Sequence, residues 1–374
     1  MKIFEIVTQI GSGGAERLVV DLCNELAKDN EVTLISIYSF NEKSIYLKEI
    51  HQNINIISLR RNNKHLLNLL APMFSLYHLI KTEKPDIVHT HLSAIEHTML
   101  SWLTIRRIKF VQTIHSDAFK ESEGGLHLII RKLAFYYRLV VPVTISEASR
   151  LSFTKLYKRD SVLIRNGRPS YDFGNDVSGV KKELNSFKST KDTYILINVA
   201  RINEVKNQLP LANAVKQLNL ESHNVELVII GAENDKQIAS ELKQIEHTHI
   251  LGLKSNPRDY AKCGDAFVLT SVYEGMPITL IECFSVGTIP LCTPVGGIVN
   301  MIKDGENGLL ADGTSMEDIK NLLKRFMSLS NGEKIRMKEA SLNSFPSYSI
   351  EYCGKQYNRL FYQLANKIKD RINV

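Results

Sequence analysis

The sequence has few cysteines, and their arrangement excludes two kinds of structure. Five cysteines occur in 374 residues, and no two of them stand in a Cys-x-x-Cys spacing. Disulfide-stapled folds and structural zinc sites use cysteines that are paired and closely spaced. We therefore expect neither, and this cysteine usage fits a reducing compartment.

A leader segment and long apolar runs are lacking as well. Glu5 interrupts the short apolar run at the N-terminus and no small-residue cleavage site follows, which predicts a first strand and not a signal peptide. The segment Leu66–Ile80 is about five residues shorter than a bilayer span. The segment Leu126–Ile145 contains three basic residues. No transmembrane helix is predicted, and a cytoplasmic location is expected.

Acidic residues are outnumbered by basic ones, and the formal net charge is +7. Several basic residues of the first half adjoin apolar stretches: Arg60, Arg61, Lys64, Arg106, Arg107 and Lys109. This pattern is compatible with peripheral contact with an anionic membrane, at the inner face of the plasma membrane, and equally with a mildly basic surface. Because no helix-turn-helix, RNA-binding or zinc-finger signature accompanies the charge, no nucleic-acid partner is expected.

Short β-branched runs alternate with helical stretches through the first half of the chain. The predicted strands are Ile3–Val7, Val32–Tyr38, Ile54–Leu59, Asp86–His91, Phe110–His115, Val140–Ile145 and Val162–Arg165. The predicted helices between them include Ala15–Ala27, Leu92–Ile105 and Glu147–Tyr157. Short, mostly apolar strands are typical of parallel sheets that helices cover on both faces. The alternation predicts a doubly wound α/β domain.

The alternation stops around Asn166–Asp192, where turn-forming and polar residues predict a linker. It then restarts, with predicted strands Tyr194–Ala200, Val225–Ile230, His249–Leu253, Ala266–Thr270 and Ile289–Thr293, and the chain is mostly helical after Gly313. We predict two Rossmann-like doubly wound domains facing a cleft. Residues 1–178 form the first, residues 179–350 the second, and residues 351–374 a helix packing back on the first.

Two acidic residues flank a predicted strand–loop–helix turn in the second domain. After Ala266–Thr270, Gly275 permits a tight turn and Pro277 suits the first turn of a helix. Glu274 would then lie at the carboxyl end of the strand, and Glu282 on the helix. The start of the helix leaves backbone amides without intrahelical partners, which suit a diphosphate. An acid near the helix cap and a solvated helix acid are the alternative interpretation.

Two basic residues follow another strand of the same domain. The predicted strand Tyr194–Ala200 leads directly into Arg201, and Lys206 follows after a short loop. Two cations at the carboxyl end of a strand could neutralise a diphosphate leaving group without a metal ion. An ordinary surface arginine and lysine are the alternative.

Taken in order, these motifs resemble those of glycosyltransferase family 4, which are retaining enzymes with the two-domain GT-B fold. The resemblance covers roughly residues 1–315 and includes Arg201 with Lys206, Glu274 with Glu282, Gly11–Arg17, Thr144–Glu147, Arg165–Gly167, Thr293–Gly297 and Asp304–Leu310. Each motif is weakly specific by itself, whereas the ordered set is specific.

The resemblance implies an activity and its substrates. The donor would be a nucleoside-diphosphate sugar, with UDP favoured and GDP next. The acceptor would be a hydroxyl of a glycan or of a polyprenyl-diphosphate-linked glycan, as in capsule or O-antigen synthesis. The enzyme would be a hexosyl- or N-acetylhexosaminyltransferase that keeps the anomeric configuration and needs no metal or other cofactor.

The resemblance also assigns roles to residues. Arg201 and Lys206 would bind the donor diphosphate and stabilise it as it leaves. Glu282 would hold the ribose hydroxyls, and Glu274 would lie by the donor sugar. The remaining donor-binding candidates are residues whose backbone would lie close to the ligand. They are Gly13 and Gly14 after the first strand, and Gly275, Met276, Pro277, Ile278, Thr279 and Leu280 after Glu274.

Histidines at strand ends are further candidates. The family often carries a histidine close to the donor sugar at the place of His115, which makes His115 a candidate catalytic residue; a structural histidine is the alternative. His89 and His91 fall on one face of a strand, but no acidic or cysteine residue stands near them in the sequence. We therefore predict no metal site there.

Two other functions remain open from the sequence. One is a nucleotide-sugar epimerase of the same fold, and the other is a non-catalytic two-domain ligand-binding protein. A dinucleotide fingerprint is not complete after the first strand, because Glu16 occupies the position of its third glycine. No Gly-x-x-x-x-Gly-Lys-Ser/Thr loop occurs, which weighs against a nucleoside triphosphatase.

Overall fold

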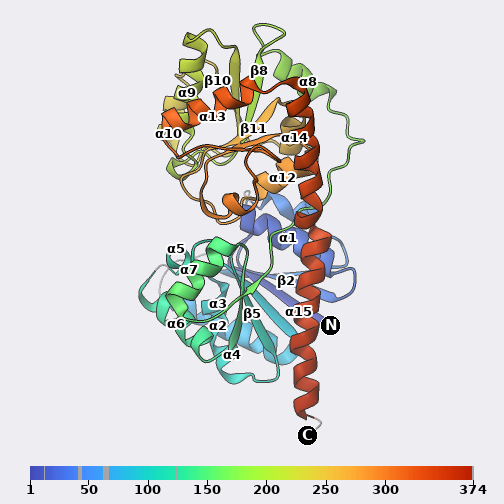
Figure 1. The fold of residues 1–374 in the computed structure, drawn as a ribbon. Coiled ribbons are helices and arrows are strands. Elements are labelled where there is room, and N and C mark those ends of the chain that lie inside the picture. Colours follow the sequence, from blue (N-terminus) through green and yellow to red (C-terminus); the bar gives the residue numbers. More distant parts are fainter. Residues whose placement is uncertain (12, 41–43, 62–66, 123, 373–374) are drawn as a thin grey trace. The chain divides into compact units, whose positions relative to one another are not determined.

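The computed structural model describes the chain except for residues 12, 41–43, 62–66, 123 and 373–374, and except for the side chains of residues 60–69 and 367–372. The chain forms two compact units (Figure 1). Unit 1 comprises Met1–Pro169 and Tyr348–Val374, and unit 2 comprises Ser170–Ser347. The chain therefore changes unit at 169/170 and 347/348, earlier than the predicted boundaries at 178/179 and 350/351.

Unit 1 is built on a seven-stranded parallel sheet in the order β3-β2-β1-β4-β5-β6-β7. Its strands are β1 Lys2–Val7, β2 Glu31–Tyr38, β3 Asn55–Arg61, β4 Ile87–His91, β5 Lys109–Ile114, β6 Val140–Thr144 and β7 Val162–Leu163. Its helices are α1 Gly14–Leu26, α2 Leu67–Glu83, α3 Ala94–His97, α4 Met99–Thr104, α5 Ala118–Glu121, α6 Gly125–Tyr136, α7 Glu147–Tyr157 and α15 Ile350–Ile372.

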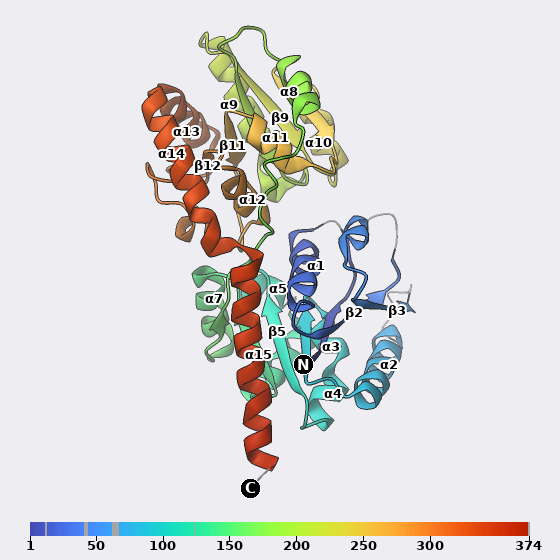
Figure 2. The ribbon, with the colours of Figure 1, turned by 90° about the vertical axis from the view of Figure 1, so that its right-hand side faces the viewer.

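The two faces of this sheet are covered by different helices. Phe4 and Ile6 of β1 face a core that contains residues of α2, α3, α4, α6 and α7. On the opposite face α15 packs against α1, as Figure 2 shows. There the Tyr357 hydroxyl of α15 lies 2.8 Å from Thr113 Oγ1 of β5. None of the described helices combines the length and the apolar character needed to cross a membrane.

The return of the chain to unit 1 depends on a close backbone approach. The Arg168 amide donates to the Tyr348 carbonyl at 3.0 Å, and the Ile350 amide donates to the Arg168 carbonyl at 2.9 Å. A Cβ atom on Gly167 would lie 2.6 Å from the Ser349 carbonyl oxygen. Gly167 is therefore the residue that lets the two crossing segments touch, which positions the start of α15.

Unit 2 contains a six-stranded parallel sheet in the order β10-β9-β8-β11-β12-β13. Its strands are β8 Tyr194–Val199, β9 Val225–Ile230, β10 Thr248–Gly252, β11 Ala266–Leu269, β12 Pro290–Cys292 and β13 Leu309–Leu310. Its helices are α8 Ser178–Asn185, α9 Gln208–Leu220, α10 Lys236–Leu242, α11 Pro257–Cys263, α12 Ile278–Val286, α13 Met316–Ser328 and α14 Asn331–Ser344.

Two local predictions are wrong, and one strand was missed. The predicted helix Leu92–Ile105 is two short helices, because Leu92 adopts a left-handed conformation (φ 55°) and Thr98 separates α3 from α4. The two-residue strand β13 was not predicted. The predicted linker contains α8, whose buried Val180 and Leu184 pack in a cluster of unit 2. Two apolar residues in a polar segment are too weak a pattern to predict such a helix.

Candidate functional site

The site candidates of unit 2 lie where the chain order of its sheet reverses. β9 pairs with one side of β8, and β11 pairs with the other side. Arg201 and Lys206 follow β8, while Glu274 follows β11. Ligands of open α/β sheets bind outside the carboxyl ends of the strands at such a switch point. The sheet topology therefore brings the predicted basic and acidic residues to one location.

The loop after β8 carries the two basic residues. The Arg201 side chain is exposed, and none of the residues that the structure describes pairs with its guanidinium group. The short 3-10 helix η2, Glu204–Lys206, begins after Asn203, whose side chain accepts from the Lys206 amide at 3.1 Å. The Val272 amide of the next loop donates to the Val205 carbonyl at 2.9 Å. The loops after β8 and β11 are thus bonded to each other.

Lys206 and Glu274 form an ion pair across these loops. Lys206 Nζ lies 2.6 Å from Glu274 Oε1, and the Ser271 hydroxyl donates to the same oxygen at 2.6 Å. The Glu274 side chain is 9% exposed and that of Lys206 is 20% exposed. An ammonium group has three hydrogens to donate, so Lys206 can serve Glu274 and an anionic ligand together.

The start of α12 differs in detail from the prediction. Pro277 is the N-cap residue, with ψ 121°, and precedes the first helical turn. The Leu280 amide, predicted to face a ligand, instead donates to the Pro277 carbonyl at 3.2 Å. No side chain of the described residues caps the helix, so the amides of Ile278 and Thr279 are placed for an external acceptor. Gly275 and the buried Met276 form the preceding loop, and Glu282, 9% exposed, lies one turn into α12.

Two further residues hold the Glu274 loop, and the sequence had suggested no role for them. Gly296 has a φ of +55°, and a Cβ atom there would lie 1.7 Å from the Glu274 carbonyl oxygen. The Thr293 hydroxyl donates to the Ser271 carbonyl at 2.6 Å. Both residues belong to the motif Thr293–Gly297, to which the family resemblance assigns no individual role. Gly296 is required because its Cα lies directly against the backbone of Glu274, where a side chain would not fit.

Gly13 and Gly14 lie in unit 1 at the start of α1. Gly13 is the N-cap of that helix. A Cβ atom on Gly13 would lie 2.3 Å from Glu16 Oε2, so a larger residue there would displace the Glu16 carboxylate. Arg17 of the same motif pairs with the buried Asp21 at 3.0 Å, which gives it a structural role. Gly13, Gly14 and His115 thus belong to unit 1, whereas the other predicted site residues belong to unit 2.

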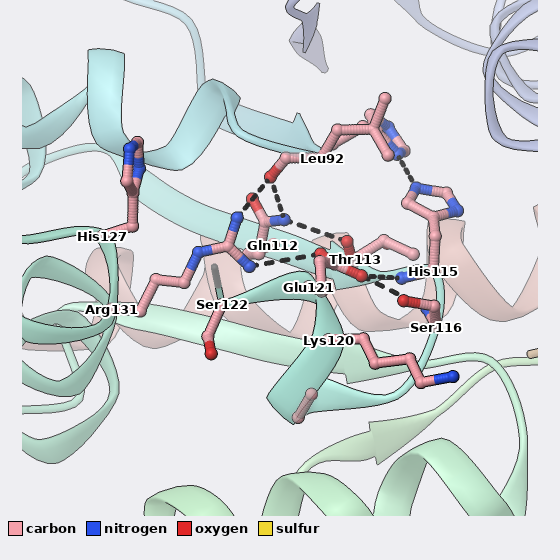
Figure 3. Close-up of polar contacts among 12 residues, drawn as sticks. Leu92, Gln112, Thr113, His115, Ser116, Lys120, Glu121, Ser122, His127 and Arg131 are labelled. Carbon is pink, nitrogen blue, oxygen red and sulfur yellow. Dashed lines mark hydrogen bonds and ion pairs between the residues drawn. The ribbon is translucent and has the colours of Figure 1, made fainter. Parts of the chain in front are cut away.

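His115 is held at both its backbone and its ring. Its amide donates to Glu121 Oε2 at 2.7 Å, and the Ser116 amide donates to the same oxygen at 3.2 Å (Figure 3). Glu121 Oε1 accepts from Arg131 Nη1 at 3.3 Å. The Nε2 atom of His115 lies 3.0 Å from Nδ1 of His91. Burial, followed by the neighbouring His91, lowers the pKa of His115 well below its usual value, so this imidazole is neutral.

His89 and His91 do have an acidic partner, which strand pairing supplies from far away in the sequence. Glu5 of β1 pairs in register with His89 of β4. Glu5 Oε1 lies 3.0 Å from His89 Nδ1, and Glu5 Oε2 lies 2.8 Å from His91 Nε2. These three residues offer ligand atoms within 4.8 Å of one another and are fully buried. Hydrogen bonds account for each of those atoms, and the predicted absence of a metal site stays a prediction.

Comparison with known proteins gives the family. The family model described as Glycosyltransferase Family 4 matches residues 12–168, and that described as Glycosyl transferases group 1 matches residues 180–343. Two curated bacterial relatives are similar over most of their length. The GalNAc-alpha-(1->4)-GalNAc-alpha-(1->3)-diNAcBac-PP-undecaprenol alpha-1,4-N-acetyl-D-galactosaminyltransferase of Campylobacter jejuni is 23% identical, over 98% of this chain and 99% of that protein. The UDP-Gal:alpha-D-GlcNAc-diphosphoundecaprenol alpha-1,3-galactosyltransferase of Escherichia coli is 26% identical, over 70% of this chain and 72% of that protein.

Solved structures agree on the architecture. The Anabaena protein HepE in complex with UDP-glucose has a TM-score of 0.80 at 17% identity, covering 97% of this chain and 100% of that chain. At that identity the likeness concerns the fold. The two family models cover one unit each, and both units are parallel-sheet α/β domains. The chain belongs to glycosyltransferase family 4 and has the two α/β domains of the GT-B fold.

Proposed function

We propose that this glycosyltransferase moves a hexosyl or N-acetylhexosaminyl group from a nucleoside-diphosphate sugar to a hydroxyl group, with retention of the anomeric configuration and without a metal ion. The observation that carries the proposal is the Lys206–Glu274 pair at the switch point of the unit 2 sheet, 2.6 Å between charged atoms. Arg201 lies on the same loop as Lys206, and the uncapped start of α12 follows the loop that carries Glu274. Two cations and free amides are what a diphosphate needs.

The chemistry follows from where charge develops. When the bond to the anomeric carbon breaks, negative charge grows on the diphosphate and positive charge grows on the sugar ring. Arg201 and Lys206 stabilise the first, and the carboxylate of Glu274 stabilises the second or binds the sugar hydroxyls. Such contacts strengthen in the transition state and therefore raise the rate more than they raise substrate affinity. Glu282 binds the ribose hydroxyls. The departing phosphate accepts the proton of the attacking acceptor hydroxyl on the same face of the sugar.

The substrate class rests on the relatives. HepE was solved with UDP-glucose, and the E. coli relative is named for a UDP-galactose donor, so UDP is our first choice of nucleotide and GDP the second. Both bacterial relatives are named for acceptors linked to undecaprenol through a diphosphate. We propose an acceptor glycan linked to a polyprenyl diphosphate, in the synthesis of a cell-surface polysaccharide.

A turnover assay tests this function. The full chain is incubated with UDP-sugars or GDP-sugars, with and without polyprenyl-diphosphate-linked glycans, and product and free nucleotide are measured by mass spectrometry. We expect nucleotide release that depends on the acceptor and a product with the donor's anomeric configuration. Consumption of a donor without acceptor, giving an epimer, would replace the proposal with an epimerase. A rise in Tm on adding a nucleotide sugar, without any turnover, would favour a non-catalytic binding protein instead.

A lipid-linked acceptor requires contact with a membrane, and unit 1 has a suitable surface. Helix α6 exposes a row of large apolar side chains at helical spacing: Leu126, Ile129, Leu133 and Tyr136, each between 41% and 59% exposed. Lys120, Lys132 and Arg138 are exposed and lie near that row in the sequence. Apolar side chains next to cations fit an anionic lipid surface. Of the residues predicted for this role, Arg106 and Arg107 are exposed elsewhere in unit 1, Lys109 is half-buried, and the side chains of Arg60, Arg61 and Lys64 lie outside the described part.

Vesicle binding tests the α6 surface. We expect the chain to sediment with phosphatidylglycerol vesicles, to bind phosphatidylcholine vesicles poorly, and to be released by salt. A triple variant with Leu126, Ile129 and Leu133 changed to Ser should lose this binding. Leu220→Ser, which changes a leucine that is 75% exposed in unit 2, should keep it. Equal binding by the triple variant and the wild type would exclude α6 as the membrane contact.

A further inference from the structure

A chain of buried polar residues in unit 1 ends at the ring of His115. Strands β1, β4 and β5 are neighbours, and Glu5, His89, His91 and Thr113 point to the sheet face that α15 covers. Glu5, His89, His91 and Thr113 are all fully buried. Burying this many polar groups is costly unless each has a hydrogen-bond partner. Their contacts therefore constrain which atoms carry protons.

The Glu5 carboxylate fixes the protons of both neighbouring histidines. Burial opposes its ionisation, but the two histidines, chiefly His89, lower the pKa of Glu5 to about 2, so it is an acceptor only. His89 Nδ1 and His91 Nε2, at 3.0 and 2.8 Å, must therefore each donate to it. Burial, together with His89, lowers the pKa of His91 to about 4, so this ring carries one proton at neutral pH. That proton is on Nε2, which leaves Nδ1 of His91 as an acceptor.

The assignment passes from His91 to His115. His91 Nδ1 and His115 Nε2 are 3.0 Å apart, and since the first is an acceptor, the second must carry the hydrogen. His115 is neutral, so its remaining nitrogen, Nδ1, then holds a lone pair. In Figure 3 one nitrogen of the His115 ring makes the hydrogen bond to His91, and the other ring nitrogen points away from that contact. The amide contacts to Glu121 hold the backbone of the same residue at 2.7 Å.

The other branch from Glu5 leads away from His115. His89 Nε2 lies 2.8 Å from Thr113 Oγ1, which lies 2.8 Å from the Tyr357 hydroxyl. His89 donates from Nδ1 to Glu5, and the Thr113 hydroxyl lies between His89 Nε2 and the Tyr357 hydroxyl. This branch satisfies buried groups and ties α15 to the sheet. It provides an internal control, because it shares Glu5 but has no contact with His115.

We propose that Glu5, acting through His91, is a positioning residue that holds His115 in the tautomer whose Nδ1 accepts a hydrogen bond, so that this position selects a substrate hydroxyl that can donate. The inference rests on the proposed function and on the expectation, drawn from the family resemblance, that His115 lies close to the donor sugar. In the opposite tautomer Nδ1 would carry a hydrogen and would select an acceptor group. The buried Glu5 carboxylate, which bonds His91 across 86 residues of sequence, thereby decides whether His115 presents an acceptor or a donor to the substrate.

Nitrogen NMR of the ligand-free full chain, with 15N-histidine, tests the tautomer directly. His115→Gln and His91→Gln spectra assign the signals. We expect His91 and His115 to carry hydrogen on Nε2 at neutral pH, and His89 to carry it on Nδ1. A His115 ring protonated on Nδ1, or on both nitrogens, would overturn the proposal. This measurement needs no turnover, so a failure of the proposed function would not alter its result.

Kinetics then test the role of Glu5. Loss of a fixed hydrogen bond of this kind should lower kcat/KM about tenfold in Glu5→Gln. The same change made in a His115→Ala background should have less than a twofold effect, because Glu5 acts only through His115. Tyr357→Phe, on the other branch, should stay within twofold of the wild type. Glu5→Ala serves as a second variant if Glu5→Gln is poorly folded. Equal losses from the Glu5 change in both backgrounds would show a general structural role and overturn the proposal.

Discussion

Removing the Lys206 charge is the sharpest test of the unit 2 site. Lys206→Met keeps the aliphatic stem of the side chain and deletes the ammonium group. If this group stabilises the leaving diphosphate, its loss should lower kcat by roughly 10²–10³, the range for one donor aimed at developing charge. KM for the donor should change much less, because the contact strengthens mainly in the transition state.

The same change should destabilise unit 2 by a moderate amount. The Glu274 side chain, 9% exposed, would keep the Ser271 hydroxyl as its donor at 2.6 Å but lose its cation. Since some water still reaches the pair, we expect a cost of about 1–2 kcal/mol, below that of breaking a fully buried pair. For a unit of this size that corresponds to a fall in Tm of roughly 3–6 °C.

A double variant separates the two effects. Lys206→Met with Glu274→Gln removes both charges, so stability should partly recover while activity should not. Lys243→Met is the matched control, because Lys243 pairs with Glu233 at 2.8 Å on the exposed surface of the same unit. The assays are nucleotide release and thermal denaturation. A folded Lys206→Met enzyme with kcat within threefold of the wild type would refute the diphosphate assignment.

Three further predictions follow from the structure. Glu282→Gln should raise KM for the donor about tenfold with kcat retained, if it binds the ribose in ground and transition state alike; an unchanged KM would count against that role. Gly296→Ala should destabilise unit 2 by about 1–3 kcal/mol and lower activity, because its Cβ would meet the Glu274 carbonyl and its φ is +55°; wild-type stability in a urea titration would contradict the close approach. Unit 1 should lose stability as pH falls from about 6.5 toward 4: the unfolded chain binds protons on His91 and His115 in that window, whereas the folded pKa of His91 is about 4. Trp102, the sole tryptophan and 2% exposed in the unit 1 core, reports this by fluorescence during denaturation; a flat profile would show that no proton uptake accompanies unfolding there.

Most of the α/β architecture was predictable from the sequence because it depends on local periodicity. The predicted strands Val225–Ile230 and Val32–Tyr38 match the structure to within one residue, and helix Glu147–Tyr157 matches at both ends. Elements with a weak local pattern were missed. The helix α8 has two buried apolar residues, and the strand β13 has two residues in all. Such elements form because of what they pack against, which a local pattern does not contain.

The common location of the basic and acidic residues of unit 2 was predictable for a related reason. Arg201, Lys206 and Glu274 stand in the loops that follow strands, and the carboxyl end of a strand in a parallel sheet is recognisable from the sequence. The role of Gly296 was not recognisable, because a glycine that permits contact with Glu274 resembles any other glycine in a loop.

The sequence by itself determined which residues end strands and begin helices, and hence that two α/β domains carry basic and acidic groups at their sheet edges. Only the tertiary structure decided which of these groups meet. Lys206 reaches Glu274 across 68 residues of sequence, and Glu5 reaches His89 across 84. The alternation of side chains along a strand indicates which residues share a face of the sheet, but strand order and register determine which residues of neighbouring strands they contact. For that reason His89 and His91 lacked an acidic partner in the sequence and have one in the folded protein.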